Sequence, residues 1–154
     1  MIKITITKGN YIPGIPKHQF KLRAQYQVTP EWSIGTNIVA FSDRFLHGNE
    51  NNKHQENSAG CSTDDEIACA KGKTAGFTVV NLDSQYNLGQ GWQLWAKAIN
   101  VFDQDYYSTG RLAGNAFTAT GNTFEAETNE WRGAAFLSPG APRAGWIGVR
   151  YEFK

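Results

Sequence analysis

Several features that define large classes of protein are missing from this sequence. No run of apolar residues approaches the ~18 that a membrane-crossing helix needs, and the N-terminal residues lack the pattern of a signal peptide. The 15 basic side chains are balanced by 14 acidic ones, so no long-range field would attract nucleic acid. We therefore expect neither a helical membrane anchor nor a nucleic-acid partner.

Motifs of catalysis, phosphate binding and metal coordination are also missing. The sequence holds no Gly-x-Ser-x-Gly, His-Glu-x-x-His, Gly-rich phosphate loop or paired-cysteine motif. Its three histidines have no nucleophile beside them. The acidic run Asp64-Asp65-Glu66 lacks the glycine and the ordered oxygen spacing of a calcium loop, so we interpret it as solvated loop charge. We expect no enzyme, no metal site and no cofactor.

The residues that are abundant favour β-structure. Aromatic residues make up 13% of the chain, there are 16 glycines, and methionine occurs only at the start. This balance suits strands and turns better than packed helices. The mean hydropathy of −0.48 is compatible with membrane strands, because each needs only about 9–11 residues of alternating character. The length and even composition predict one all-β domain over residues 1–154.

Strict alternation of apolar and polar residues is the strongest signal. Between residues 18 and 28 it accounts for every position after the first, which indicates a strand with one apolar and one polar face. Other segments repeat the pattern, although Trp95 breaks it in residues 92–101. Six antiparallel strands are predicted, over residues 2–8, 18–28, 32–41, 77–88, 92–101 and 144–153.

The alternation sorts side chains onto two faces. We expect one face to be apolar and directed outward, and the opposite face to carry the polar and charged groups. The apolar set is Phe20, Leu22, Tyr26, Val80, Leu82, Tyr86, Ile147, Val149 and Tyr151. The opposite set is Lys21, Arg23, Asp83, Gln85 and Arg150.

The connections between these strands alternate in length. Tight turns at residues 29–31 and 89–91 alternate with long connections at 42–75 and 103–143. In an up-and-down sheet, all the long connections then lie at one end. This asymmetry is typical of outer-membrane barrels, which have short periplasmic turns and long extracellular loops.

Aromatic residues bracket both tight turns. Tyr26 and Trp32 flank the first turn, and Tyr86 and Trp92 flank the second. In a barrel these rings would lie in the headgroup layer at one membrane edge. Aromatic residues flank hairpin turns in soluble sheets as well, so it is the loop asymmetry that favours the membrane interpretation.

Three motifs resemble one family, the TonB-dependent outer-membrane receptors. Asn100-Val-Phe-Asp103, followed by Tyr106-Tyr107, is similar to the family's Asn-Leu-Phe-Asp segment before a nearby tyrosine. Pro139-Gly-Ala-Pro-Arg143 is similar to the entry into its last strand, and Ile12-Pro-Gly-Ile-Pro16 to a loop entering an earlier strand. Their order and spacing agree over nearly the whole chain from Tyr11 onward.

The resemblance implies a fold and a role. The family's barrels have twenty-two strands and a plug domain, so residues 1–154 would be a C-terminal portion with about six transmembrane strands, lacking the plug and the earlier strands. The receptor would lie in the outer membrane of a Gram-negative bacterium, in contact with outer-membrane lipid. It would take up a ligand such as a ferric siderophore with energy from TonB, which acts through the missing N-terminal part. The fragment alone would not be active.

Cys61 and Cys69 lie in the long connection at 42–75, and we expect them to form a disulfide. Disulfides persist in exported loops, and the intervening residues can form a compact loop. The alternative is a metal site with His47 or His54, but these residues do not have a recognised zinc spacing.

Four cations are expected to face the lumen of the barrel. There they would form ion pairs with the plug or, alternatively, contact the ligand. The four are Lys21, Arg23, Lys97 and Arg150.

Aromatic residues of the long loops form a second group of candidates. Tyr106, Tyr107 and Trp131 are expected to contact a ligand at the mouth of the barrel, because exposed rings commonly mark binding surfaces. Packing of the loops on themselves explains these rings equally well.

The strand predicted at residues 144–153 is the last of the chain. It should pair antiparallel with residues 92–101 and leave its other edge open, because sequential antiparallel strands usually pair with their neighbours. The resemblance implies that Tyr151 and Phe153 belong to a C-terminal assembly signal, although Lys154 follows where the family usually ends on an aromatic residue.

The rival interpretation is a soluble or periplasmic all-β module that binds a ligand or partner, and it predicts apolar faces buried in a core.

Overall fold

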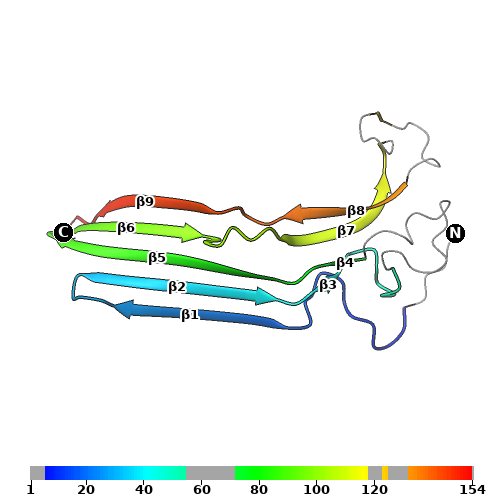
Figure 1. The fold of residues 1–154 in the computed structure, drawn as a ribbon, viewed down its shortest axis with the longest axis horizontal. Coiled ribbons are helices and arrows are strands. Elements are labelled where there is room, and N and C mark those ends of the chain that lie inside the picture. Colours follow the sequence, from blue (N-terminus) through cyan, green and yellow to red (C-terminus); the bar gives the residue numbers. More distant parts are fainter. Residues whose placement is uncertain (1–5, 55–71, 118–122, 125–131, 154) are drawn as a thin grey trace. The chain divides into compact units, whose positions relative to one another are not determined.

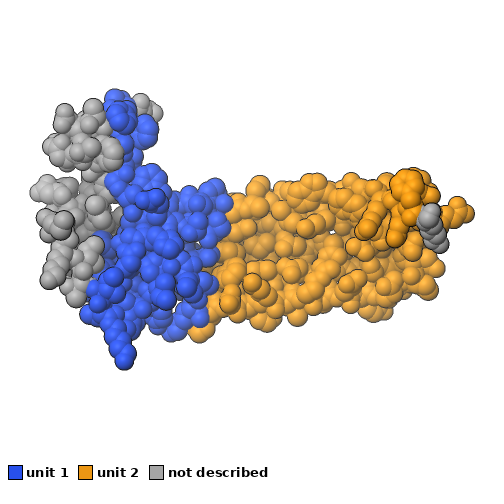
Figure 2. All heavy atoms as spheres, turned by 180° about the vertical axis from the view of Figure 1, so that it is seen from behind, with its two compact units in different colours: residues 1–17, 43–75, 107–139 blue, residues 18–42, 76–106, 140–154 orange. Residues whose placement is uncertain are grey.

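The computed structural model describes residues 6–54, 72–117, 123–124 and 132–153. These residues contain strands and turns, and they form two compact units, which Figure 2 colours separately. Unit 1 comprises residues 1–17, 43–75 and 107–139, and unit 2 comprises residues 18–42, 76–106 and 140–154. No helix in these described ranges is long and apolar enough to cross a membrane.

Unit 2 is a five-stranded antiparallel sheet whose strands lie side by side (Figure 1). Each strand pairs with its predecessor in the sheet, in the order β1-β2-β5-β6-β9. Five of the six predicted strands are confirmed to within two residues at each end. The bounds are Gln19–Gln27 for β1, Trp32–Phe41 for β2, Phe77–Gly89 for β5, Trp92–Ile99 for β6 and Ala144–Tyr151 for β9.

The last strand has the predicted partner. β9 pairs antiparallel with β6, with Trp92 opposite Tyr151 and Ile99 opposite Ala144. In the described residues, its other edge has no strand beside it. The sheet is therefore open at both β1 and β9, and its backbone groups there remain available to further strands.

The register confirms the predicted sorting of side chains. Leu22 is opposite Ile38, which is opposite Val80. On the following strands, Tyr86 is opposite Leu94, which is opposite Val149. One face of the sheet, which we call the apolar face, carries no charged strand residue. The other, which we call the polar face, carries Lys21, Arg23, Asp83, Lys97 and Arg150 among its strand residues.

The turn between β5 and β6 depends on glycine. Gly89, Gln90 and Gly91 all have positive φ, at 81°, 51° and 86°. The Glu152 amide donates a hydrogen bond to the Gly91 carbonyl oxygen at 2.9 Å. A Cβ added to Gly91 would lie 2.5 Å from the carbonyl oxygen of Glu152. Only glycine both adopts this backbone conformation and permits the close approach of the C-terminal segment.

The described residues of unit 1 contain four strands that the periodicity did not predict. β3 (Arg44–Phe45) pairs with β4 (Lys73–Thr74), and β7 (Tyr107–Asn115) pairs with β8 (Arg132–Pro139). The connection at 103–143 is therefore partly a hairpin and not a continuous loop. Its glycines and small polar residues hide it from a search for alternating apolar residues.

The strand expected at residues 2–8 is absent from the part of that range that the structure describes. Residues 1–5 lie outside the described residues, and residues 6–8 are not in a strand. Thr7 instead begins a turn, since its carbonyl oxygen accepts a hydrogen bond from the Asn10 amide at 3.2 Å and Gly9 has a φ of 103°. Local turn chemistry prevails over the alternating pattern here.

Candidate functional site

The polar face of unit 2 has an unbalanced charge. Its strand residues include the four cations named above and one carboxylate, that of Asp83. The expected lumen-facing side chains therefore share one face of the sheet. The cation Lys21 also lies over the ring of Phe41, with 6.0 Å between Nζ and the ring centroid.

Arg23 and Asp83 form an ion pair that spans a whole strand. Arg23 lies on β1 and Asp83 on β5, with Gly35 of β2 between them. Nη2 of Arg23 donates a hydrogen bond to Oδ2 of Asp83 at 2.9 Å, and Nη1 bonds the other oxygen. Such a bidentate ion pair fixes the orientation of both side chains.

Gly35 is what allows this pair to form. A Cβ at Gly35 would lie 2.6 Å from Nη2 of Arg23 and 2.6 Å from Oδ2 of Asp83. Lys97 is the partner of Asp83 on the next strand, so three charged residues form one cluster that extends from β1 to β6. They line a concavity of about 460 Å³ together with polar residues of the same strands.

Trp95, which breaks the alternation in β6, has a structural explanation. It lies opposite Gly148 of β9, and a Cβ on that glycine would be 2.5 Å from the indole ring. The missing side chain leaves room for the large ring on the polar face. Pairing an aromatic residue with a glycine across strands is a known way to stabilise such a position.

A set of hydrogen bonds, which we call the clasp, joins the chain after β6 to the chain before β9. Asn100 is at its centre and is only 2% exposed. Its Nδ2 donates to the carbonyl oxygens of Gln104 and Ala141, both at 3.0 Å, and its Oδ1 accepts from the Gln104 amide at 2.9 Å. Asp103 accepts a hydrogen bond from the Arg143 amide at 3.1 Å and pairs with its guanidinium at 3.4 Å.

The clasp consists of motif residues noted in the sequence. Asn100 and Asp103 have positive φ, at 47° and 54°, a conformation that Asn and Asp adopt more easily than most residues. Their side chains satisfy backbone groups of the segment that enters the last strand. The two motifs that lie about forty positions apart are therefore one structural unit.

The candidate ligand-contacting tyrosines have different surroundings. Tyr106 belongs to unit 2, where its ring lies 4.3 Å from that of Phe77 and closely covers Gly140. Tyr107 begins β7 of unit 1 and is 46% exposed. Trp131 lies outside the described residues. The packing of Tyr106 favours a structural role for that ring, and the exposed Tyr107 retains a surface available to a ligand.

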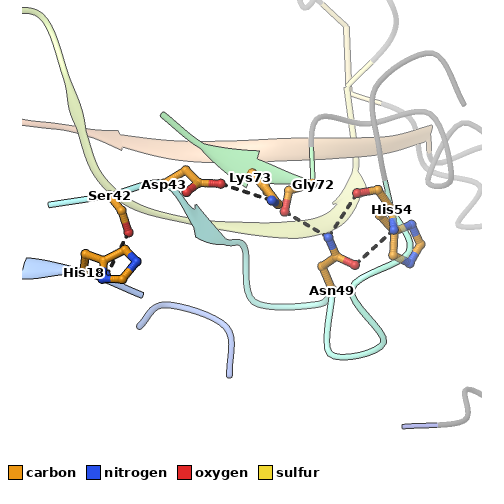
Figure 3. Close-up of polar contacts among 7 residues, drawn as sticks. All are labelled: His18, Ser42, Asp43, Asn49, His54, Gly72 and Lys73. Atoms are coloured by element: carbon orange, nitrogen blue, oxygen red, sulfur yellow. Dashed lines mark hydrogen bonds and ion pairs between the residues drawn. The ribbon is translucent and has the colours of Figure 1, made fainter. Parts of the chain in front are cut away.

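In unit 1, a buried asparagine organises the base of a long connection (Figure 3). Asn49 is fully buried, and its Nδ2 donates to the carbonyl oxygens of His54 at 3.1 Å and Gly72 at 2.9 Å. Its Oδ1 accepts from the His54 amide at 3.1 Å. Nearby, Lys73 pairs with Asp43 at 3.1 Å. Periodicity gave no signal for Asn49, because its role depends on chain segments that are distant in sequence.

Two further sets of predicted residues remain. Cys61 and Cys69 lie outside the described residues, so their disulfide stays a prediction. Among the residues that the structure does describe, no group of three or more His, Cys, Asp or Glu side chains could hold a metal ion. At the C-terminus, the Tyr151 ring contacts Trp92 and Phe153, with centroid distances of 4.6 Å and 4.7 Å.

Comparisons with solved structures identify the fold. The ferric-catecholate import receptor Fiu of E. coli K12 matches 92% of this chain at 20% identity and a TM-score of 0.56. The ferric citrate transporter FecA matches 92% at 23% identity and a TM-score of 0.59, and the copper transporter OprC matches 95% at 24% and 0.53. The chain spans 15%, 17% and 18% of these three chains, respectively.

The family is established by the sequence itself. A search of curated proteins found no match. The sequence model of the TonB-dependent receptor-like β-barrel matches residues 3–101, which is well over half of the chain. Members of this family are outer-membrane receptors and transporters, not enzymes. The chain thus belongs to the TonB-dependent receptor β-barrel family.

Proposed function

We propose that this chain forms the C-terminal part of an outer-membrane receptor that takes up a ligand such as a ferric siderophore with energy from TonB. It supplies barrel wall and extracellular loops, and it is inactive without the remaining strands and the plug. Siderophore uptake is the favoured role because the structures named above include import receptors for ferric catecholate and ferric citrate.

The observation that carries this proposal is the two-faced sheet. The apolar face is uncharged and exposed, with Ile147 at 86% and Tyr26 at 67%. Such a surface is unfavourable in water and favourable in lipid. The strands also have suitable lengths, since β1 has 9 residues and β2 has 10, close to the number that crosses a bilayer.

The rival function, a soluble or periplasmic binding module, requires a buried apolar core. Within the described residues, the buried hydrophobic side chains are Leu46 and Val79. Val79 lies on the polar face of the sheet, and Leu46 belongs to unit 1. The apolar face of the five strands therefore has no core to bury it, and the membrane function is favoured.

The polar face is assigned to the lumen, where its cations contact the plug. Arg23 already has Asp83 as a partner, whereas Lys97 and Arg150 form no ion pair with a carboxylate of the described residues. We assign these two side chains to carboxylates of the plug. Tyr107 and Trp131 are assigned to ligand contact in the loops, and Tyr151 and Phe153 to the C-terminal assembly signal.

Spin labelling tests the assignment of the two faces. Single cysteines are introduced at residues 82 to 86 of β5 in the receptor, labelled, and reconstituted in bilayers. Labels at 82, 84 and 86 should be relaxed by dissolved oxygen, which concentrates in lipid, and labels at 83 and 85 should not. A uniform response along the strand would refute the membrane position.

Growth on iron tests the ligand. A strain that lacks its other receptors should grow on a ferric siderophore as its iron source only when it carries the complete receptor and an intact TonB system. Growth independent of TonB would contradict the energised mechanism, and failure on every ferric siderophore tried would contradict the ligand class.

A further inference from the structure

The concavity on the polar face of unit 2 carries one positive charge in excess. We call it the Lys97 pocket, and its volume is about 460 Å³. All of its lining residues belong to unit 2, so its geometry does not depend on unit 1. Two cations and one carboxylate line it, together with amide side chains and one indole ring. The lining includes Arg23, Asn37, Asp83, Gln85, Trp95 and Lys97.

Lys97 lies where an ion pair with Asp83 would be expected. The two residues are directly opposite on β6 and β5, a position from which opposite charges attract across strands. Lys97 nevertheless forms no ion pair with any carboxylate that the structure describes, and its side chain is exposed. Asp83 is bound instead to Arg23, which lies two strands away on β1.

The guanidinium of Arg23 is the better partner for this carboxylate. Its Nη2 bonds Oδ2 of Asp83 at 2.9 Å, and its Nη1 bonds Oδ1. Two parallel bonds from a planar guanidinium match a carboxylate more closely than one point charge does, and an ammonium is more strongly hydrated. Arg23 therefore offsets the charge of Asp83, and the positive charge of Lys97 remains.

Gly35 makes this choice of partner possible. It lies on β2 between the two charged groups, and an added Cβ would be 2.6 Å from Nη2 of Arg23 and 2.6 Å from Oδ2 of Asp83. Both atoms are at the ends of flexible side chains, so a methyl group here would displace them without moving the sheet. Asp83 would then be released from Arg23 and could turn to Lys97 on the neighbouring strand.

The remaining walls of the pocket suit a carboxylate from outside the chain. The amide groups of Asn37 and Gln85 line the pocket and make no hydrogen bond within the ranges that the structure describes. Each amide offers two N–H donors. The indole of Trp95 is placed over Gly148 and adds an apolar wall. One ammonium and two amides can satisfy both the charge and the oxygens of a single carboxylate.

We propose that Arg23 is a positioning residue, which occupies Asp83 and thereby keeps Lys97 available to a carboxylate of the segment that fills the lumen. The single positive charge left in the pocket matches one carboxylate. This inference rests on the proposed function in one respect, because the plug is the segment that brings the carboxylate. Loss of Arg23 or of Gly35 releases Asp83, which then neutralises Lys97 and removes the attraction for the plug.

Zero-length cross-linking identifies the carboxylate that contacts Lys97. A water-soluble carbodiimide joins a lysine amine to a carboxylate in contact with it, and peptide mass spectrometry of the complete receptor locates the link. The test variants are R23Q, G35A and R23Q/D83N. The matched controls are K21Q, which removes another cation from the same face of β1, and G145A, whose added Cβ meets only the carbonyl oxygen of Lys97 at 3.5 Å.

In the wild-type receptor, Lys97 should be linked to a carboxylate of the plug. R23Q and G35A should raise the ratio of the Lys97–Asp83 link to the plug link by at least about tenfold, the change expected when hydrogen bonds to a charged group are lost. R23Q/D83N should restore the plug link, because the competing carboxylate is gone, and a damaged fold would not produce this recovery. K21Q and G145A should behave as the wild type does.

Four results would overturn the proposal. They are an unchanged link pattern in R23Q and G35A, a Lys97–Asp83 link that already dominates in the wild type, no recovery in R23Q/D83N, and no link from wild-type Lys97 to a carboxylate outside the chain. None of them alters the spin-label test of the membrane position. Conversely, a uniform spin-label response would refute the proposed function without changing which carboxylate is linked to Lys97.

Discussion

Replacement of Asn100 by alanine tests the clasp that joins β6 to β9. The side chain makes three hydrogen bonds to backbone groups and is only 2% exposed. At about 1 kcal/mol for each bond, the loss is about 3 kcal/mol. Alanine at the observed φ of 47° costs about 1 kcal/mol more, because its Cβ disfavours the left-handed conformation. We expect Asn100→Ala to lower the free energy of unfolding by about 4 kcal/mol.

The two contributions to this loss can be separated. Asn100→Gly removes the same three bonds but tolerates the backbone conformation, so it should be less damaging than alanine by about 1 kcal/mol. Asn37→Ala is the matched control, since this asparagine lies within β2 and makes no side-chain hydrogen bond to the described residues. Its replacement should change the free energy of unfolding by no more than about 0.5 kcal/mol.

The assay is equilibrium unfolding of the receptor in detergent by guanidinium, followed by tryptophan fluorescence, with all variants measured under one condition. The guanidinium concentration at the unfolding midpoint should be highest for Asn37→Ala, lower for Asn100→Gly and lowest for Asn100→Ala. The reasoning would be refuted if Asn100→Ala were no more destabilising than the Asn37 control. If glycine and alanine behaved alike, the contribution assigned to backbone conformation would be wrong.

Three further predictions concern the turn, the C-terminus and the long connection. In the same unfolding assay, Gly91→Ala should destabilise the barrel by at least about 1 kcal/mol more than Gly89→Ala. Both glycines have positive φ, but only at Gly91 would an added Cβ meet a neighbouring carbonyl oxygen. Equal losses would show that this contact is unimportant. Phe153→Asp should reduce the amount of receptor in the outer membrane severalfold without changing its synthesis, as quantified by blotting fractions, and unaltered assembly would remove Phe153 from the proposed signal. Cys61 and Cys69 should resist alkylation in exported receptor until it is reduced, and two free thiols would contradict the disulfide.

Much of unit 2 follows from the sequence because its signals are local. The side-chain period of a strand is two residues, so the alternation in residues 18–28 fixes both the strand and its faces without knowledge of any partner. Tight turns then join β1 to β2 and β5 to β6, and the tendency of sequential strands to pair predicts the remaining neighbours. The same reasoning missed β7 and β8, because their glycines interrupt the apolar pattern. It also extended a predicted strand to residue 8, although a turn begins at Thr7.

The sequence by itself therefore determined a set of two-faced antiparallel strands and, with its motifs, the receptor family. The tertiary structure alone decided which residues act together. Arg23 meets Asp83 only because β2 lies between their strands and presents Gly35 at the crossing point. Asn100 reaches Ala141 only when β9 pairs with β6. These contacts depend on register and on sheet order, which join residues tens of positions apart, whereas periodicity reports only on neighbours along one strand.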